Sequence, residues 1–533
     1  MKAVSKKVKG TADNALFTMK TVASVQSPLR ALLLLSLLAA AVVNSGNMLS
    51  IDGQRRLQVT HWLWLGEPPV SPSDAPVFGN VGKDGRLHAW YGLGHSLWVL
   101  PFDVASHGAL ALASRAVNMP EPLRRQVDSM VVAWMSQSAL LFLALAAARA
   151  LLLRLGFTGW AVSAGTVLFL FGTSALHYVQ NCQENLLLLT CNLWAFCCVL
   201  RWRDEGRWAD ALGAGAAAGF ALLTRLTAAL EVAALLLFAF LVLRSRAWRF
   251  AGQASPAFLA FAFVERFYNF YRFGDWLGTY VPNVRDPSVG AAAVFDHPFW
   301  PGFLGPFIEP HVSIFLFDPL FPAALLLLAV NWRRLELPVR AYAAVLLSLL
   351  LAQVSVYARF IGYYGPVSWG DRYVAGTVQM LALLAVPLAA RGWAELRRAA
   401  RLAVLGLTAA AVMIQASSVL TVIGVEPMQM KRDGRPIVVV ARRWENIALI
   451  WTGRAENHPL FRGIPREWTR PAPAPFQLEF RYPRLHKPAV AAWYVLVLLT
   501  AAAALKAGCL PGYGSIWFAR RRLLQLPALR ESP

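Results

Sequence analysis

The sequence has few charged residues for its length: only 15% of its 533 residues are Asp, Glu, Lys or Arg. A soluble domain of ordinary composition carries about a quarter of such residues. Hydrophobic residues make up 57% of the chain and the mean hydropathy is +0.47. Many of them lie in blocks that approach the roughly 20 residues needed to cross a bilayer as a helix. This pattern predicts an all-α polytopic membrane protein and excludes an ordinary soluble domain.

The sequence also lacks any recognisable nucleic-acid-binding motif and any long basic tract. Its formal net charge of +22, from 51 Lys and Arg against 29 Asp and Glu, would favour a nucleic-acid partner in a soluble protein. Here the basic residues lie in short loops between apolar blocks, where they orient a membrane protein instead. We therefore expect membrane lipids around the chain and no nucleic acid as a partner.

Cysteine is scarce, and the five cysteines form no CxxC pair and no metal-ligand spacing. Four of them lie in or beside one apolar block, where small core residues are the ordinary interpretation. Neither internal repeats nor low-complexity tracts stand out. No metal site is predicted from these residues, and the histidines of the long loops are interpreted as solvated or locally bonded, so no zinc site is argued.

The apolar blocks predict about twelve transmembrane helices. The split within 208–243 is the weakest, because residues 224–227 form its only polar break. The first block follows a basic start and resembles a signal anchor, although cleavage stays open. The expected spans lie near 29–48, 130–153, 158–176, 183–201, 208–224, 226–243, 251–268, 313–331, 340–358, 373–391, 400–423 and 488–507.

The basic loops predict one orientation for the whole chain. Placing the N-terminal lysines in the cytoplasm puts the clusters at 201–207, 244–249, 333–334, 391–401 and 520–522 on the same side, as the positive-inside rule requires. Both termini are then cytoplasmic. Three large loops, 45–129, 269–312 and 424–487, are expected on the outer face.

The first acidic residue beyond the first apolar block is Asp52, which is followed by Arg55 and Arg56. A carboxylate beside arginines at a membrane surface suits an enzyme with a hydroxyl acceptor and a phosphate-bearing donor. The carboxylate can accept a proton, and the arginines can bind phosphate. The alternative is that Asp52 only caps a short amphipathic helix over 53–65.

A second stretch of the same loop, 81–102, combines cationic, aromatic and glycine residues. Its glycines allow close approach of the backbone to a ligand, and Lys83 or Arg86 could meet a phosphate. The alternative for both side chains is simple solvation.

The order of these motifs resembles the membrane glycosyltransferases of the GT-C superfamily. Asp52 is followed by Tyr91-Gly92-Leu93-Gly94-His95-Ser96 and Leu100-Pro101-Phe102. The pattern is most similar to the bacterial group related to the protein O-mannosyltransferases and the lipid A aminoarabinose transferases, glycosyltransferase family 39. Further similar segments are 177–186, with Glu184 at a span entrance, 215–225, which ends in Arg225, then 268–280, 302–320 and Trp369-Gly370-Asp371-Arg372-Tyr373.

The chain departs from the family pattern at two places. Asp52 is followed by Gly53 and not by a second acidic residue, and Glu309-Pro310 replaces a Ser-Pro before the 313–331 span. These departures weaken any transfer of a particular substrate from the family to this chain.

The resemblance implies transfer of a sugar from a polyprenyl-phosphate donor to a hydroxyl acceptor, with inversion. Asp52 would be the catalytic base. Arg372 and Arg225 would bind phosphate, and Glu184 would bind acceptor, sugar or a metal, with Lys83 and Tyr91 as further substrate-binding residues. No cofactor is certain, and a divalent metal is left open.

Each of these roles has a structural alternative. Glu184 could be an outward-facing charge at the start of a helix, stabilised by the helix dipole. Arg372 could pair locally with Asp371, and Arg225 could extend to the membrane surface.

The expected organisation follows from the resemblance and the charge pattern together. Residues 1–423 would form a GT-C-like transmembrane catalytic domain that includes the outer loop 45–129. Residues 424–487 would form a further outer loop, and 488–533 the last transmembrane helix with a basic cytoplasmic tail. The active site would lie at the outer face of a bacterial-type cytoplasmic (inner) membrane.

Other function classes stay open. A multi-pass transporter or flippase of a lipid-linked glycan fits twelve spans, although carriers usually show broken helices, repeats and polar residues at the membrane midplane. A glycan polymerase or ligase would place its key residues in a late loop. The sequence does not choose among lipid, glycan and protein acceptors, and it identifies neither the sugar nor the oligomeric state.

Overall fold

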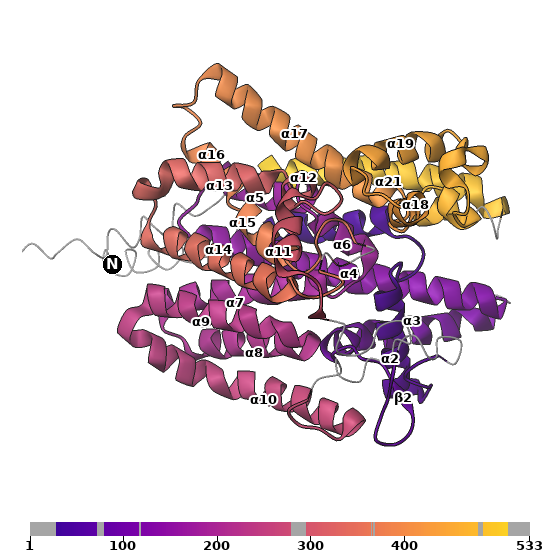
Figure 1. Ribbon diagram of the computed structural model, residues 1–533, viewed down its shortest axis with the longest axis horizontal. Coiled ribbons are helices and arrows are strands. Elements are labelled where there is room, and N and C mark those ends of the chain that lie inside the picture. Colours follow the sequence, from indigo (N-terminus) through magenta and orange to yellow (C-terminus); the bar gives the residue numbers. More distant parts are fainter. Residues whose placement is uncertain are drawn as a thin grey trace, which may run out of the picture.

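The computed structural model describes residues 28–71, 79–116, 119–278, 295–363, 365, 368–477 and 483–509. Almost all regular structure in these ranges is helical (Figure 1). The described strands form one small hairpin, β1 (Asn80–Val81) and β2 (Leu87–His88), in which Asn80 lies opposite His88 and Val81 opposite Leu87.

An N-terminal helix, Pro28–Val43, precedes the labelled helices. These are α2 (Ile51–Leu65), α3 (Gly94–Ala116), α4 (Glu121–Arg154), α5 (Trp160–Phe171), α6 (Ala175–Asn181), α7 (Asn185–Glu205), α8 (Trp208–Thr224), α9 (Ala229–Leu243), α10 (Ala247–Phe273), α11 (Phe299–Ile308), α12 (Ile314–Phe317), α13 (Leu320–Asn331), α14 (Leu337–Tyr357), α15 (Ala375–Ala382), α16 (Ala385–Arg391), α17 (Arg398–Leu420), α18 (Val425–Asp433), α19 (Val439–Trp451), α20 (Ala474–Gln477) and α21 (Pro483–Cys509).

The fold is that of a multi-pass membrane protein. Seven described helices are long and apolar enough to cross a membrane, or eight if the pair α5 and α6, bent by 49°, is one span. Many large apolar side chains are exposed on the outside of the bundle, among them Leu237 on α9 and Phe263 on α10. Exposed apolar surface of this kind suits contact with lipid.

The count of seven or eight differs from the twelve spans expected from the sequence, although every expected span overlaps a described helix. One reason is that three apolar helices are short: Pro28–Val43, α8 and the α15–α16 stretch Ala375–Arg391. Another is that Leu226–Phe273 counts once, although it contains both α9 and α10. These two helices are joined at Arg244, which has a φ of +54° and reverses the chain direction (Figure 1).

The expected outer loop 45–129 contains one of the seven long apolar helices, Gly94–Arg115. Its mean hydropathy of 1.2 is the lowest of the seven. Polar residues such as Asp103 and His107 interrupt its apolar stretches, so a search for unbroken apolar blocks does not find it.

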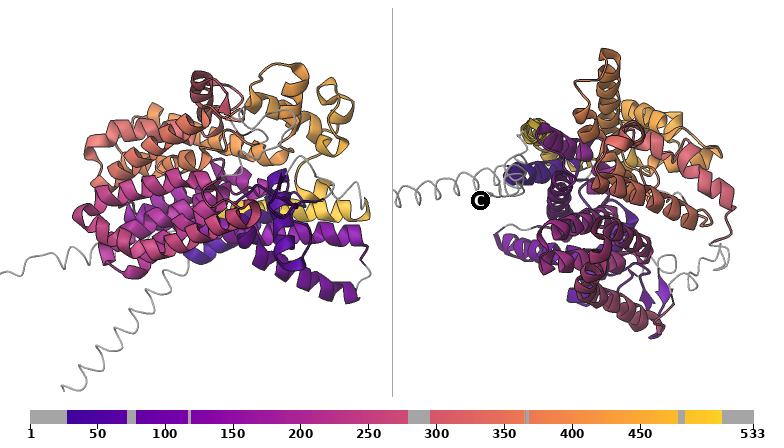
Figure 2. Two further views of the ribbon diagram at one scale, coloured as in Figure 1. Left: turned by 60° about the horizontal axis from the view of Figure 1, so that its bottom comes forward. Right: turned by 90° about the vertical axis from the view of Figure 1, so that its left-hand side faces the viewer.

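The two ends of the bundle differ in character. Figure 1 shows the α9–α10 and α13–α14 turns at one end, and Arg244, Arg246, Arg333 and Arg334 belong to these turns. At the opposite end lie α2, α3, α18 and α19, and Figure 2 shows the same grouping from a second direction. The arginines of these two turns therefore lie at the end of the bundle opposite to α2, α3, α18 and α19.

Close packing of small residues holds part of the bundle together. The helix α8 packs against α10 through Gly215, where a Cβ atom would lie 2.0 Å from the carbonyl oxygen of Ala254. Only glycine permits this approach of two backbones, which is a common device between membrane helices.

Several sequence-based expectations concern residues outside the described ranges. They include the N-terminal lysines, the basic tail at 520–522 and the central part of the expected loop 269–312.

Candidate functional site

Asp52 lies in the first turn of α2 and is held by two partners from distant segments. Its Oδ2 accepts from Arg372 Nη1 at 2.6 Å, and its Oδ1 accepts from the Tyr91 hydroxyl at 2.7 Å. Ser50, and not Asp52, caps α2, because the Ser50 hydroxyl accepts from the Gly53 N–H at 2.9 Å. Capping is therefore not the reason for a carboxylate at this position.

Glu184 lies at the start of α7 and is only 5% exposed. Its Oε2 lies 2.6 Å from Arg56 Nη2, and its Oε1 accepts from Arg225 Nη2. An outward-facing charge would be solvated, whereas this carboxylate is buried between two guanidinium groups. The alternative of a solvated helix-start charge does not hold.

The two carboxylates belong to one cluster, which we call the Asp52–Glu184 cluster and define as Asp52, Arg56, Tyr91, Glu184, Arg225 and Arg372. The Arg56 guanidinium lies 4.3 Å from the ring centre of Tyr91, and so it connects the partners of Glu184 to those of Asp52. The cluster holds three arginines against two carboxylates. Its formal charge is therefore positive when both acids are ionised.

Some guanidinium groups of the cluster retain donor capacity. Among the described residues, the buried Nε and Nη1 of Arg56 and the buried Nε of Arg372 have no hydrogen-bond partner. Buried donors without partners are costly, so their presence in a positively charged cluster points to an anionic ligand.

The backbone around the two acids is conformationally unusual. Leu49, three residues before Asp52, has a φ of +41°, and Cys182, two residues before Glu184, has a φ of +52°. Such conformations cost about 1–3 kcal/mol each for residues other than glycine, and they tend to occur at functional sites. The two segments also touch, because a Cβ at Gly53 would lie 3.1 Å from the Cys182 carbonyl oxygen and 2.7 Å from that of Met48. This contact explains why glycine follows Asp52.

The segment that carries Tyr91 is fixed from two sides. Arg272 of α10 donates from Nη1 to the carbonyl oxygens of Ala89 and Tyr91. The glycines that follow pack on the end of α8, since a Cβ at Gly94 would lie 2.2 Å from the Thr224 hydroxyl oxygen. The Tyr-Gly-x-Gly motif thus sets Tyr91 beside the chain segment that leads to Arg225.

The loop that carries Arg372 is fixed at the entrance of α7. Asn185 donates to the Arg372 carbonyl oxygen at 2.5 Å, and the ring of Tyr373 lies under both guanidinium groups, 5.3 Å from Arg372 and 5.6 Å from Arg225. Asp371 is buried and accepts from the backbone N–H of Tyr373 at 2.9 Å. The partner of Arg372 is therefore Asp52 and not its neighbour Asp371.

The surroundings determine the charges in the cluster. Burial acts to raise the pKa of Asp52, but Arg372 and Arg56 outweigh it and leave this pKa below its ordinary value. Burial likewise opposes ionisation of Glu184, yet Arg225 and Arg56 bring its pKa well below the usual range. Burial and the nearby Asp52 carboxylate raise the pKa of Tyr91 above its ordinary value. At neutral pH both acids are carboxylates and Tyr91 is a neutral donor.

The structure brings together five of the six residues singled out from the sequence: Asp52, Tyr91, Glu184, Arg225 and Arg372. Lys83 lies elsewhere, with its Nζ 4.3 Å from the ring centre of Phe270 and its backbone N–H bonded to Arg272. Arg56, which the sequence analysis noted beside Asp52 but did not include among these six, also belongs to the cluster. Its spacing of four residues from Asp52, on one face of α2, was the available signal.

The donor set does not fit the divalent metal left open by the sequence. Both carboxylates of the cluster are already ion-paired to arginines. Among the residues that the structure describes, no group of three or more His, Cys, Asp or Glu side chains could hold a metal ion.

Comparison with known proteins finds no family model, no curated protein and no solved structure that matches the chain. The function of the Asp52–Glu184 cluster must therefore be inferred from its own side chains.

Proposed function

We propose that the protein is a membrane glycosyltransferase of GT-C-like architecture, which transfers a sugar from a polyprenyl-phosphate donor to a hydroxyl acceptor with inversion. The site would lie at the outer face of a bacterial-type cytoplasmic membrane, with both chain termini in the cytoplasm. The acceptor would be a lipid, a glycan or a protein.

One observation carries this proposal: a carboxylate that can serve as a base lies in a cluster with an excess of arginines, some of whose buried donors have no partner among the described residues. Inverting transfer requires both parts. A base must take the proton of the acceptor hydroxyl, and cations must neutralise the departing phosphate. Arginine suits the second task because its planar fork meets two phosphate oxygens at once.

The Asp52–Arg372 ion pair suggests how the two tasks are linked. A lowered pKa makes Asp52 a weak base while Arg372 is its partner. When the donor phosphate takes over Arg372, Asp52 loses its main counter-charge and becomes more basic. The acceptor oxygen then forms a bond to the anomeric carbon, its proton passes to Asp52, and the bond from that carbon to the phosphate oxygen breaks with its electron pair leaving on the phosphate.

The remaining members of the cluster support this chemistry. Tyr91 orients the Asp52 carboxylate through its hydrogen bond, and Glu184 holds Arg56 and Arg225 in place for the phosphate or the sugar. Each carboxylate neutralises part of the arginine charge. A bound phosphate would neutralise the charge that remains.

A carrier of lipid-linked glycans is the second candidate, and one observation favours it. The pair α5 and α6 is bent by 49°, as in the broken helices of many transporters. The Asp52–Glu184 cluster, however, lies at the start of α2 and α7 and not in the middle of a long helix.

The test is transfer of label from a polyprenyl-phosphate sugar in membranes that contain either the wild type or Asp52→Asn. Removal of a general base typically lowers the rate about 10²–10⁴-fold. Asn keeps the size of the side chain and can still accept from Tyr91, so the protein should remain folded. Full activity of Asp52→Asn would refute the role of base, and saturable solute movement without product would favour the carrier.

A further inference from the structure

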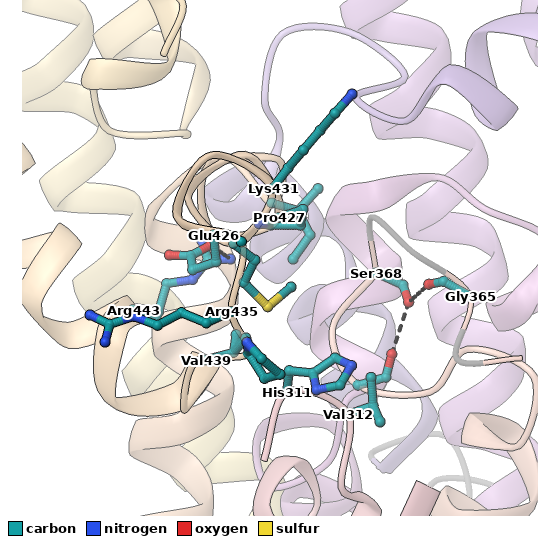
Figure 3. A pocket seen from close by; sticks show the side chains of 15 residues that line it. His311, Val312, Gly365, Ser368, Glu426, Pro427, Lys431, Arg435, Val439 and Arg443 are labelled. Carbon is teal, nitrogen blue, oxygen red and sulfur yellow. Dashed lines mark hydrogen bonds and ion pairs between the residues drawn. The ribbon is translucent and has the colours of Figure 1, made fainter. Parts of the chain in front are cut away.

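A separate cavity of about 480 Å³ lies beside the loop that carries Arg372. Three parts of the chain form it: residues 311–312 before α12, then Gly365, Ser368 and Gly370 before Arg372, and residues 423–443, which include α18 and the start of α19. Figure 3 shows Ser368 and Val312 on one side of the cavity and Glu426, Pro427 and Val439 on the other. None of the residues of the Asp52–Glu184 cluster lines it.

Arg443 lines this cavity although its side chain is fully buried. Its Nη2 lies 2.7 Å from Glu426 Oε2, its Nη1 donates to the Thr421 carbonyl oxygen at 2.9 Å, and its guanidinium lies 5.0 Å from the ring centre of Trp369. Among the described residues, however, Arg443 Nε has no hydrogen-bond partner. A buried guanidinium N–H without a partner at a cavity wall points to an acceptor atom of a ligand.

The charge of the cavity wall also favours an anion. Glu426 is neutralised by Arg443 and accepts from Asn446 at 2.7 Å. Lys431 and Arg435 are exposed at the rim, so two positive charges remain. The rest of the wall is largely apolar, with Ile423, Met430 and Val439 among its members. This combination suits an anionic group attached to an apolar or amphiphilic body.

The cavity adjoins the Asp52–Glu184 cluster through one loop. Gly365 lines the cavity and also touches Arg372, since a Cβ at Gly365 would lie 2.3 Å from Arg372 Cγ. Trp369, three residues before Arg372, stacks on Arg443. A molecule held in the cavity would therefore lie next to the loop that carries Arg372, the partner of Asp52.

We propose that this cavity binds an anionic oxygen group, a phosphate or a carboxylate, carried by the acceptor at a distance from the reacting hydroxyl. Arg443 would donate from Nε, and the exposed Lys431 and Arg435 would bind the group from the rim of the cavity. This assignment rests on the proposed sugar transfer, which makes the acceptor the molecule that must lie beside Asp52. It narrows the acceptor class to hydroxyl compounds that also carry a negative charge.

The test measures binding without any donor, using full-length protein in nanodiscs of zwitterionic lipid. Labelled inorganic phosphate is titrated in one arm, and in a second arm phosphatidic acid in the nanodisc competes for the same site. The test variant is Lys431→Gln with Arg435→Gln, because both side chains are exposed and their loss should leave folding intact. Loss of two charge-assisted contacts should weaken binding at least about tenfold.

The matched control is Arg454→Gln with Arg466→Gln, which removes the same charge from exposed positions that do not line the cavity. It should change the affinity less than about twofold. Rim-dependent binding of free phosphate supports the site, and displacement of that phosphate by phosphatidic acid in the wild type additionally identifies a lipid headgroup as the source. An equal effect of both variant pairs, or no effect of either, overturns it.

Failure of the anion site can be distinguished from failure of the proposed sugar transfer. Rim-dependent binding by a protein that transfers no sugar would contradict the transferase and leave the anion site standing. Sugar transfer with an unchanged acceptor KM in the rim variant, together with no phosphate binding, would refute the anion site alone.

Discussion

Replacing Arg372 with lysine tests whether the cluster needs a planar fork or only a positive charge. Arg372 donates from Nη1 to Asp52 at 2.6 Å, while its buried Nε has no partner among the described residues. A lysine ammonium is a point charge on a flexible stem, and it cannot present two parallel donors to a phosphate. We therefore expect Arg372→Lys to keep the fold and lose one charge-assisted hydrogen bond to the donor phosphate.

The size of the effect follows from that single bond. A hydrogen bond to a charged group contributes about 1.5–3 kcal/mol. Since each 1.36 kcal/mol is tenfold in rate, the loss predicts a fall of about 10–150-fold in kcat/KM for the donor. The substitution also alters the cation–π contact with Tyr373, 5.3 Å from Arg372, which contributes about 0.5–2 kcal/mol.

The assay is the initial rate of label transfer from a polyprenyl-phosphate sugar, in membranes adjusted to equal amounts of folded protein. Arg454→Lys is the matched control, because Arg454 is exposed and lies outside both the cluster and the cavity. The control should retain wild-type activity. Activity of Arg372→Lys within twofold of the wild type would refute the need for bidentate phosphate binding.

Three further predictions concern packing, pH and topology. Gly53→Ala should lower both the thermal stability and the rate of sugar transfer, because the new Cβ would lie 2.7 Å from the Met48 carbonyl oxygen. Gly406→Ala in α17 is the control, because no atom lies within 4 Å of its new Cβ. It should leave the thermal stability unchanged or raise it slightly. Burial raises the pKa of Asp371 to about 7 in the folded protein, so this carboxyl group ionises at a lower pH in the unfolded chain. The free energy of unfolding should therefore fall as the pH rises from about 4 to about 7. Asp371→Asn should lose this part of the pH dependence. Reporter fusions at Arg334 and Arg435 should report the cytoplasm and the outer compartment respectively, and a shared compartment would contradict the proposed orientation.

The ionised state of the cluster has its own pH signature. The folded pKa values of Asp52 and Glu184 lie below their ordinary values of 3.8 and 4.5, so both ion pairs contribute stability above those values. This contribution should be lost only as pH falls below about 4 and the carboxylates are protonated in the folded protein. Acid unfolding of Glu184→Gln in detergent should show a shallower dependence on pH than the wild type. An identical dependence would contradict the assigned charges.

Much of the helical fold could be predicted from apolar blocks alone, because the membrane imposes long helices with few charges. The expected number of twelve spans is not confirmed. The break at 244–249 between two spans is expected from its basic residues, whereas α3 is apolar only on average, and three apolar helices are shorter than a full span. The lengths of the helices depend on tertiary packing, which a scan of local composition does not contain.

The cluster could be predicted in part because all of its members except Tyr91 are charged residues close to apolar blocks. Asp52 and Arg372 are 320 positions apart, and only their chemical types and the family resemblance suggested a shared site. Lys83 was included for its charge and position in the loop, yet it packs on Phe270 instead. The cavity at Arg443 lay beyond prediction, because the 424–487 segment has little apolar periodicity and gave no sign that Arg443 would be buried.

The most direct measurement is the stoichiometry and stereochemistry of transfer by the purified protein in liposomes, with a polyprenyl-phosphate sugar of defined anomeric configuration and a panel of hydroxyl acceptors. The account predicts one polyprenyl phosphate released for each glycoside formed, with the anomeric configuration inverted and with loss of both products in Asp52→Asn. Retention of configuration, or movement of the lipid-linked sugar across the bilayer without a new glycosidic bond, would contradict it.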